Sequence, residues 1–271
     1  MATQLFEGKE HASCYQKFRL SPSQEIQDMI FSYLHERLNE PYELAVDVGC
    51  GTGQSTKFLA PHFRKVLGTD ISEAQIEEAN KALKLPNTTF RALPAEQVPV
   101  EDASVDLLIA CAAVHWFEIG KFLKEVDRIL KPRGCLAFFS YLPTMEVHYK
   151  DRSEQMCKLI KEVDDHMRKT EHEKVKLVRS SYKEIFDAIP YTDKIRRADM
   201  FTKTTMPLAD LIGLIQTFST FQTYLRNEPE KAKDFIKTTE ERFLEIMEAS
   251  SNKTEVEVMW KYVIVLASKP K

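Results

Sequence analysis

Three closely spaced glycines and a later aspartate are the residues of this sequence whose types and spacing could bind a ligand. Gly49, Gly51 and Gly53 come directly after an apolar stretch, and Asp70 follows the last of them by 17 residues. A strand that ends in such a loop can turn sharply without Cβ clashes, so a ligand can lie against main-chain amides at the start of the next helix. A carboxylate at the end of the following strand can accept hydrogen bonds from both hydroxyls of a ribose. The pattern therefore predicts a nucleoside site.

The glycine spacing bears on which kind of nucleoside is expected. A dinucleotide site normally has two residues between its second and third glycines, which leaves the helix dipole open to a pyrophosphate. Here one residue separates Gly51 from Gly53. The shorter spacing favours a nucleoside without phosphates. A nicotinamide cofactor is the sharper alternative, and an ordinary tight turn beside a surface aspartate is the other.

A second group of residues could bind the partner of that nucleoside. His115 and Trp116 follow a predicted strand, where an aromatic face could pack against a cation and the imidazole could accept a proton. Tyr15 and Arg19 lie in a polar segment that we expect to be weakly structured and to fold over the site. Arginine can hold a carboxylate by two parallel hydrogen bonds. The alternatives are a solvated Arg19 and a buried, structural His115–Trp116 pair.

Alternating strands and helices must position these residues. A serine, a proline and a glutamine at positions 21, 22 and 24 precede apolar residues at helical spacing, which predicts a helix over residues 22–38. Apolar runs predict strands over 44–48, 65–69, 88–91, 105–110 and 135–141, and a capping box predicts a helix over 72–85. This alternation predicts a doubly wound, mostly parallel α/β sheet with helices on both faces and ligands at the carboxyl ends of its strands.

The second half of the chain has a different pattern. Residues 145–188 and 208–249 are rich in charge with helical periodicity, whereas 194–203 and 255–268 are typical of strands that return to the sheet. We expect a seven-stranded sheet in one domain, with a lid and helix in residues 1–40, a core in 41–142 and a helical cap in 143–271 between the late strands. The charged stretches 150–176 and 227–245 have mixed signs, which predicts solvated helix faces.

Composition excludes several classes of function. The formal charge of -3 and pI of about 6.2 provide no basic field for nucleic acid, and no apolar run approaches the roughly 20 residues that span a bilayer. The five cysteines are far apart, which favours reduced thiols over a disulfide framework or a zinc site. These features predict a cytoplasmic protein that binds neither nucleic acid, membrane nor metal.

The successive motifs at residues 46–53, 68–71, 95–96 and 105–108 resemble those of class I, Rossmann-type methyltransferases that use S-adenosylmethionine. The resemblance covers residues 44–142 and implies a Rossmann-like fold. It implies that the three glycines face the amino-acid part of the cofactor, Asp70 its ribose and Ile71 its adenine. Pro94 stands where many such enzymes have an aspartate, so the adenine amino group is expected to meet Ala95 and Glu96. The implied cofactor set is completed by Asp47, Cys50 and Cys111.

Residues 11–20, 113–117 and 216–219 resemble the trans-aconitate methyltransferase-like branch, which methylates small acids or related compounds. The resemblance implies an enzyme that methylates a small molecule, with a carboxylate as the preferred acceptor and a methyl ester as product. A carboxylate needs no base, whereas an amine or hydroxyl acceptor would have to lose a proton, for which His115 is the candidate. We expect a monomer or weak dimer with Tyr15, Arg19, His115 and Trp116 around the acceptor. The alternatives are another small-molecule N- or O-methyltransferase and a noncatalytic S-adenosylmethionine-binding protein.

Overall fold

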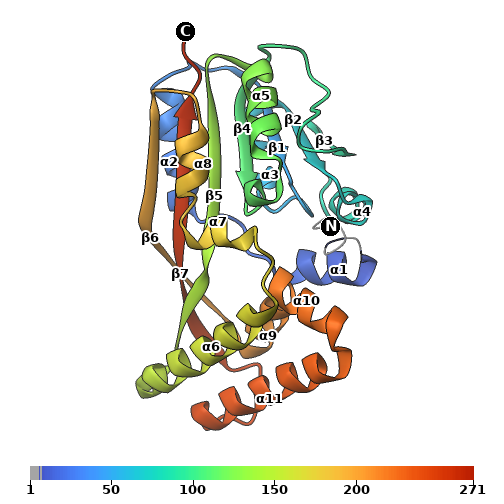
Figure 1. Ribbon diagram of the computed structural model, residues 1–271, viewed down its shortest axis with the longest axis vertical. Coiled ribbons are helices and arrows are strands. Elements are labelled where there is room, and N and C mark those ends of the chain that lie inside the picture. Colours follow the sequence, from blue (N-terminus) through green and yellow to red (C-terminus); the bar gives the residue numbers. More distant parts are fainter. Residues whose placement is uncertain (1–5, 7) are drawn as a thin grey trace.

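The centre of the molecule is a seven-stranded sheet with the order β3-β2-β1-β4-β5-β7-β6 (Figure 1). The computed structural model describes residue 6 and residues 8–271. Strands β1 to β5 pair in parallel, and β7 is antiparallel to both β5 and β6. The predicted seven-stranded, mostly parallel sheet is thus confirmed. The strands are β1 Tyr42–Val48, β2 Phe63–Asp70, β3 Thr88–Ala92, β4 Val105–Cys111, β5 Leu130–His148, β6 Lys194–Pro207 and β7 Glu255–Ser268.

Helices cover both faces of the sheet because the central strands are apolar on both sides. In β4, Leu107 and Ile109 point into one core, while Leu108 and Ala110 point into the other, as the two-residue period of a strand requires. Helices α2 and α6 pack on the first face, and α5 and α8 on the second. Their bounds are α2 Gln24–His35, α3 Thr56–Leu59, α4 Glu73–Ala82, α5 Ile119–Ile129, α6 Ser153–Met167, α7 Val175–Arg179 and α8 Lys183–Ala188.

The last three strands reach beyond the sheet core and carry a helical cap. Strand β5 continues to His148, past the predicted end at Tyr141, and the expected helix is therefore wrong at residues 145–148. The extension persists because β7 pairs with it on the far side of a register shift between Tyr141 and Met145. Helices α6 to α8 lie between β5 and β6. Between β6 and β7 lie α9 Leu208–Gln216, α10 Ser219–Asn227 and α11 Pro229–Met247 (Figure 1).

Two expectations near the N-terminus need correction. Residues 9–18 form helix α1, Lys9–Phe18, in place of a weakly structured segment. Helix α2 begins at Gln24 with Ser23 at its N-cap, two residues later than predicted. Pro22 therefore lies before the first turn, and its carbonyl accepts a hydrogen bond from the side chain of Gln27 at 2.8 Å.

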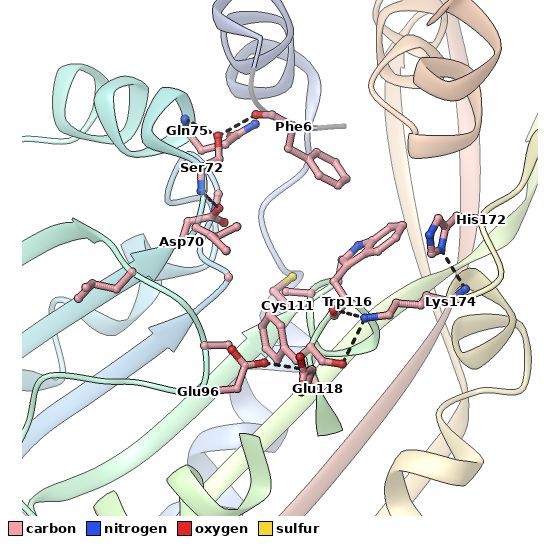
Figure 2. Close-up of a pocket in the computed structure, with 18 of the residues that line it drawn as sticks. Phe6, Asp70, Ser72, Gln75, Glu96, Cys111, Trp116, Glu118, His172 and Lys174 are labelled. Carbon is pink, nitrogen blue, oxygen red and sulfur yellow. Dashed lines mark hydrogen bonds between the residues drawn. The ribbon is translucent and has the colours of Figure 1, made fainter. Parts of the chain in front are cut away.

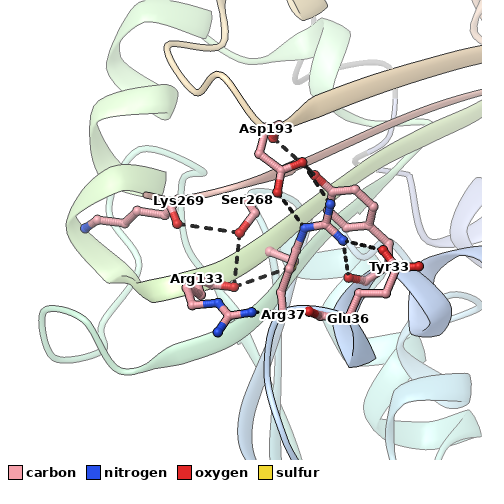
Figure 3. A network of polar contacts seen from close by, with 8 residues as sticks. Tyr33, Glu36, Arg37, Arg133, Asp193, Ser268 and Lys269 are labelled. Atoms are coloured by element: carbon pink, nitrogen blue, oxygen red, sulfur yellow. Dashed lines mark hydrogen bonds and ion pairs between the residues drawn. The ribbon is translucent and has the colours of Figure 1, made fainter. Parts of the chain in front are cut away.

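A polar network ties α2 to the ends of β6 and β7, at the amino ends of the parallel strands (Figure 3). The Arg37 guanidinium donates to both carboxylate oxygens of Asp193 at 2.8 Å and stacks on the Tyr33 ring. The Tyr33 hydroxyl donates to Asp193 at 2.8 Å. The hydrogen bonds from Arg37 lower the pKa of the Asp193 carboxyl. These bonds join α2 and the residues after it to the start of β6.

Candidate active site

The glycine loop follows β1 and has the backbone that its residue types require. Gly49, Gly51 and Gly53 have φ of +69°, +54° and +87°, which side chains with a Cβ rarely adopt. A Cβ on Gly49 would approach Ala113 within 2.5 Å. A Cβ on Gly51 would instead make only ordinary van der Waals contacts, with its nearest atoms on Tyr15 and Gln75 at 3.5 and 3.7 Å. Gly51 therefore leaves room for a ligand against the main chain.

Asp70 ends β2 and holds the glycine loop from the side. Its two carboxylate oxygens accept hydrogen bonds from the amides of Gly51 and Ser72, both at 2.9 Å. Burial raises the pKa of this carboxyl, while the bonds from Ser72 and Gly51 oppose the rise. Each oxygen retains capacity to accept another hydrogen bond, so the pair can still receive two neighbouring hydroxyls.

A cavity of about 510 Å³ opens between this loop, the segment after β4 and the residues before α7 (Figure 2). Its wall combines apolar side chains with a few polar groups, as small-molecule sites usually do. Lys174 closes one side by donating to the carbonyl of Trp116 at 2.5 Å. On the opposite side, Ser72 donates to the carbonyl of Phe6 at 2.8 Å. The cavity is thus bounded by segments that are far apart in the sequence, from Phe6 to Lys174.

The structure brings most of the expected cofactor residues to this cavity. The expected residues that line it are Gly49, Gly51, Asp70, Ile71, Ala95, Glu96 and Cys111. Asp47, Cys50 and Gly53 are outside its lining. Asp47 lies beneath the loop, where it accepts hydrogen bonds from the hydroxyls of Ser55 and Thr56 at 2.7 Å. Its pKa is raised to about 6 by burial. These three residues shape the loop that the others expose.

Several buried polar atoms around the loop have no partner within the described part of the chain. Both amide atoms of Gln75 lack a hydrogen bond, although this side chain is 2% exposed and lines the cavity. The Thr69 hydroxyl and one carboxylate oxygen of Asp47 also lack a hydrogen-bond partner among the described residues. Since buried polar groups are normally paired, Gln75 is the residue here that sequence reasoning missed and that a polar ligand would satisfy. The capping box pointed to position 75 only as part of a helix start.

A smaller cavity of about 90 Å³ adjoins the first. The two cavities share Phe6, Tyr15, Ala112 and Trp116 in their walls. Three of these are aromatic, and the Phe6 ring meets the rings of Tyr15 and Trp116 edge to face. The four predicted acceptor residues, Tyr15, Arg19, His115 and Trp116, all line the smaller cavity. A molecule in it would face one in the larger cavity across this aromatic junction.

Arg19 is the positively charged group in the smaller cavity that has no carboxylate partner among the described residues. Its Nε and Nη2 donate to the hydroxyl and the carbonyl of Thr217 at 2.8 and 3.0 Å. Its guanidinium stacks over the rings of Tyr15, Tyr141 and Phe218. The geometry holds the cation in place without neutralising it, which suits an anionic ligand.

Helix α1 is attached to α9 beside Arg19. The ring of Phe18 lies on Gly213, where a Cβ would come within 2.5 Å of it. The His11 ring also forms a hydrogen bond with the carbonyl of Thr217, with its Nε2 at 3.3 Å. The N-terminal helix and the cap therefore form one wall of the smaller cavity.

His115 is buried, and its Nδ1 is 3.1 Å from the hydroxyl of Tyr182. Burial, with the nearby charges of Lys174 and Arg19, lowers the pKa of His115 to about 3. The imidazole is therefore neutral at physiological pH and would be a weak proton acceptor. It can still position a neighbour by hydrogen bonding.

Sequence reasoning missed three charged residues in the lining of this cavity: Asp164, Glu171 and Arg179. They lie within or just after the stretch 150–176, where solvated faces were expected, and that expectation is wrong for Asp164 and Glu171, whose side chains are 20% and 8% exposed. One signal could have found Asp164. It is four residues after Ile160 and three before Met167, on the apolar face of α6.

Residue 6 and residues 8–271 contain no group of three metal-ligating side chains arranged to hold an ion. Within the same residues, every helix is too short or too polar to cross a bilayer.

The sheet order and the glycine loop after β1 are those of a Rossmann-like fold. Residues 46–138 match the family model described as methyltransferase domain. The matched segment includes the glycine loop and Asp70.

Curated relatives extend the match only over part of the chain. A protein of Dictyostelium discoideum named as a methyltransferase is 38% identical over 42% of this chain and 42% of its own length. The trans-aconitate 2-methyltransferase of Deinococcus radiodurans is 37% identical over 44% of this chain and 43% of its own length. The aligned segment thus spans less than half of each relative.

One solved structure is similar over nearly the whole fold. A protein from Anaeromyxobacter dehalogenans, described as a type II methyltransferase, covers 94% of this chain and 100% of its own at a TM-score of 0.72. The sequence identity is 23%, so this likeness shows the fold alone.

Proposed function

We propose that this chain is an S-adenosylmethionine-dependent methyltransferase that converts a small carboxylic acid into its methyl ester. The observation that carries the choice of acceptor is the Arg19 guanidinium, fixed by Thr217 and three aromatic rings in the cavity that adjoins the glycine loop. The methyltransferase domain match supports the reaction class, and the relative from Deinococcus radiodurans, named for methylation of an acid, supports the acceptor.

The larger cavity fits the cofactor by its donor set and its shape. Gly51 exposes main chain at the cavity wall, and Asp70 can accept the two ribose hydroxyls. Ile71 is 55% exposed at the cavity wall, where an adenine ring would cover it. The unpartnered Gln75 amide provides a donor and an acceptor beside them. We propose that Ala95 and Glu96 bind the adenine edge, and that Asp47, Cys50 and Gly53 support the loop from below.

Bound S-adenosylmethionine supplies an activated methyl group on a sulfonium. The protein then has to place a nucleophile in line with that group and keep water away, and positioning of this kind lowers barriers by about 7 to 11 kcal/mol in favourable cases. Arg19 would hold the carboxylate, and the aromatic junction of Phe6, Tyr15 and Trp116 would exclude water and stabilise positive charge. A carboxylate is already deprotonated at neutral pH. The low pKa of His115 is therefore compatible with this acceptor.

We propose that three segments of one domain have separate roles, as predicted from the sequence. Residues 1–40 would cover the site, residues 41–142 would bind the cofactor, and the helices of residues 143–271 would select the acceptor. Two groups of residues in the lining of the smaller cavity support this division. Tyr15 of α1 and Arg19 at its C-cap come from the N-terminal segment, and Asp164 and Phe218 come from the cap.

The test is a transfer assay with S-adenosylmethionine labelled in its methyl group, run across small carboxylic acids, amines and phenols. We expect label in acids, released as methanol by alkali as methyl esters require. Label that appears only in amines or phenols would overturn the acceptor. Binding of nicotinamide cofactors without binding of S-adenosylhomocysteine would overturn the cofactor assignment. Cofactor binding without transfer to any compound would indicate a noncatalytic binding protein.

The Arg19→Met variant sharpens this assay. Loss of a charged hydrogen bond should cost about 1.5 to 3 kcal/mol, which raises the KM for the acid at least about tenfold while affinity for S-adenosylhomocysteine stays unchanged. Lys17→Met, on an exposed position of the same helix, is the matched control and should leave both values unchanged. An unchanged KM in Arg19→Met would contradict the role of this residue.

A further inference from the structure

Three charged side chains in the lining of the smaller cavity are bound to one another. The Nε of Arg179 donates to the two oxygens of Glu171 at 2.9 and 3.1 Å. Its two Nη atoms donate to the oxygens of Asp164 at 3.3 and 3.0 Å. We call Asp164, Glu171 and Arg179 the acidic triad, because two carboxylates share one guanidinium and leave a net charge of -1.

The acidic triad is half-buried and is part of the cavity wall. The side chains of Arg179, Asp164 and Glu171 are 15%, 20% and 8% exposed. The guanidinium nitrogens are turned to the two carboxylates, so Arg179 is not free to hold a ligand anion. Each carboxylate oxygen has a second lone pair. The triad can therefore accept hydrogen bonds from a ligand, whereas a second anion would meet net negative charge.

The same cavity has its unneutralised cation, Arg19, on the wall formed by α1 and α9. A ligand carboxylate bound by Arg19 would direct the remainder of the molecule toward the other walls. The volume of about 90 Å³ leaves room for only a few heavy atoms. The lining of the cavity thus contains both an unneutralised cation and a cluster of net negative charge, and a short ligand would meet both.

We propose that the acceptor is a short monocarboxylic acid with a hydrogen-bond donor, a hydroxyl or an ammonium group, at its far end, and that the acidic triad selects against dicarboxylic acids. This inference rests on the proposed function, because it names the class of acid that the same site methylates. By the same argument a tricarboxylic acid would be a poor acceptor, because its further carboxylates would need cations where the cavity has Asp164 and Glu171.

The first test compares four-carbon acids with the unmodified protein: 4-hydroxybutyrate, 4-aminobutyrate, butyrate and succinate. We expect kcat/KM for alkali-labile methylation to be highest for the hydroxy or amino acid, intermediate for butyrate and at least about tenfold lower for succinate. Succinate methylated as well as butyrate or better would overturn the proposal. If no acid of any kind is labelled while S-adenosylhomocysteine binds, the proposed function fails, which is a different outcome.

The second test alters the triad. Glu171→Gln and Asp164→Asn keep the shape of each side chain and remove one negative charge. Each should raise kcat/KM for succinate relative to 4-hydroxybutyrate by about tenfold or more. Glu162→Gln is the matched control on α6, because it breaks an exposed ion pair with Arg242 and should leave the ratio unchanged. Thermal unfolding reports whether each variant folds, and a folded Glu171→Gln with the original ratio would overturn the proposal.

Discussion

Two arginines at opposite ends of the sheet, Arg37 and Arg19, are bound in different ways. At the amino ends of the parallel strands, Arg37 donates hydrogen bonds to both carboxylate oxygens of Asp193, which also accepts one from Tyr33 (Figure 3). At the carboxyl ends, Gln75 and Thr69 are buried without partners, and Arg19 has no carboxylate beside it among the described residues. Groups paired internally stabilise the fold, whereas groups left unpaired are available to a ligand. Variants at the two ends should therefore affect different quantities.

Gly51→Val should have the largest effect on the ligand end. Valine at a φ of +54° is strained by about 1 to 3 kcal/mol, and its branched side chain would occupy the space of the ligand. We expect heat from titration with S-adenosylhomocysteine to disappear. Gly120→Ala, where a Cβ meets nothing within 4 Å, is the control. Retained binding in a folded Gly51→Val protein would show that the ligand does not lie against this loop.

Asp47→Asn should change how stability depends on pH. The pKa of Asp47 rises from 3.8 to about 6 on folding, so the native state binds the additional proton between these values. The stabilisation is present below pH 3.8 and is lost as pH rises through about 6, by about 3 kcal/mol in total. Asparagine does not titrate. Urea unfolding at pH 4.5 and 7.5 should show the wild type losing stability relative to the variant, and parallel curves would contradict the assignment.

Asp70→Ala should weaken the ligand end without collapsing the sheet. Two charged hydrogen bonds to the ribose would be lost, which reduces cofactor affinity by about 1.5 to 3 kcal/mol. Calorimetric titration measures this change. Asp70→Ala also removes the acceptor of the Gly51 and Ser72 amides, so thermal unfolding must accompany it. An unchanged affinity would exclude Asp70 as the ribose ligand.

Arg37→Met should give the smallest effect and the opposite signature. The paired Asp193 is 48% exposed, so solvent compensates part of the loss and we expect a decrease of about 1 kcal/mol in the free energy of unfolding. Affinity for S-adenosylhomocysteine should stay the same. Chemical denaturation and calorimetry on one preparation check both values. A change in affinity would mean that the two ends of the sheet are coupled.

The same contrast explains how far the sequence could predict the structure. The core strands and the glycine loop depend on local patterns. Examples are the apolar run before Gly49 and the capping serine before α4, whose hydroxyl accepts a hydrogen bond from the main-chain N–H of Gln75. Seven of the ten expected cofactor residues line the larger cavity for that reason.

Other features depend on contacts between distant segments. The end of β5 at His148 depends on pairing with β7. The acidic triad depends on Asp164 of α6 and Glu171 meeting Arg179, the last residue of α7. The sequence around Asp164 and Glu171 is alternately charged, and no local pattern states which charges turn inward. The partnerless state of Gln75 is equally a property of its neighbours in space.

The contact between Phe18 and Gly213 has a mechanical consequence. Because the ring fills the space that any other residue at 213 would need, and because Arg19 is bonded to Thr217, helix α1 cannot lift alone without breaking both attachments. A bulky residue at position 213 would therefore displace the Phe18 ring and weaken the attachment of α1 to the cap, from a position outside the lining of both cavities.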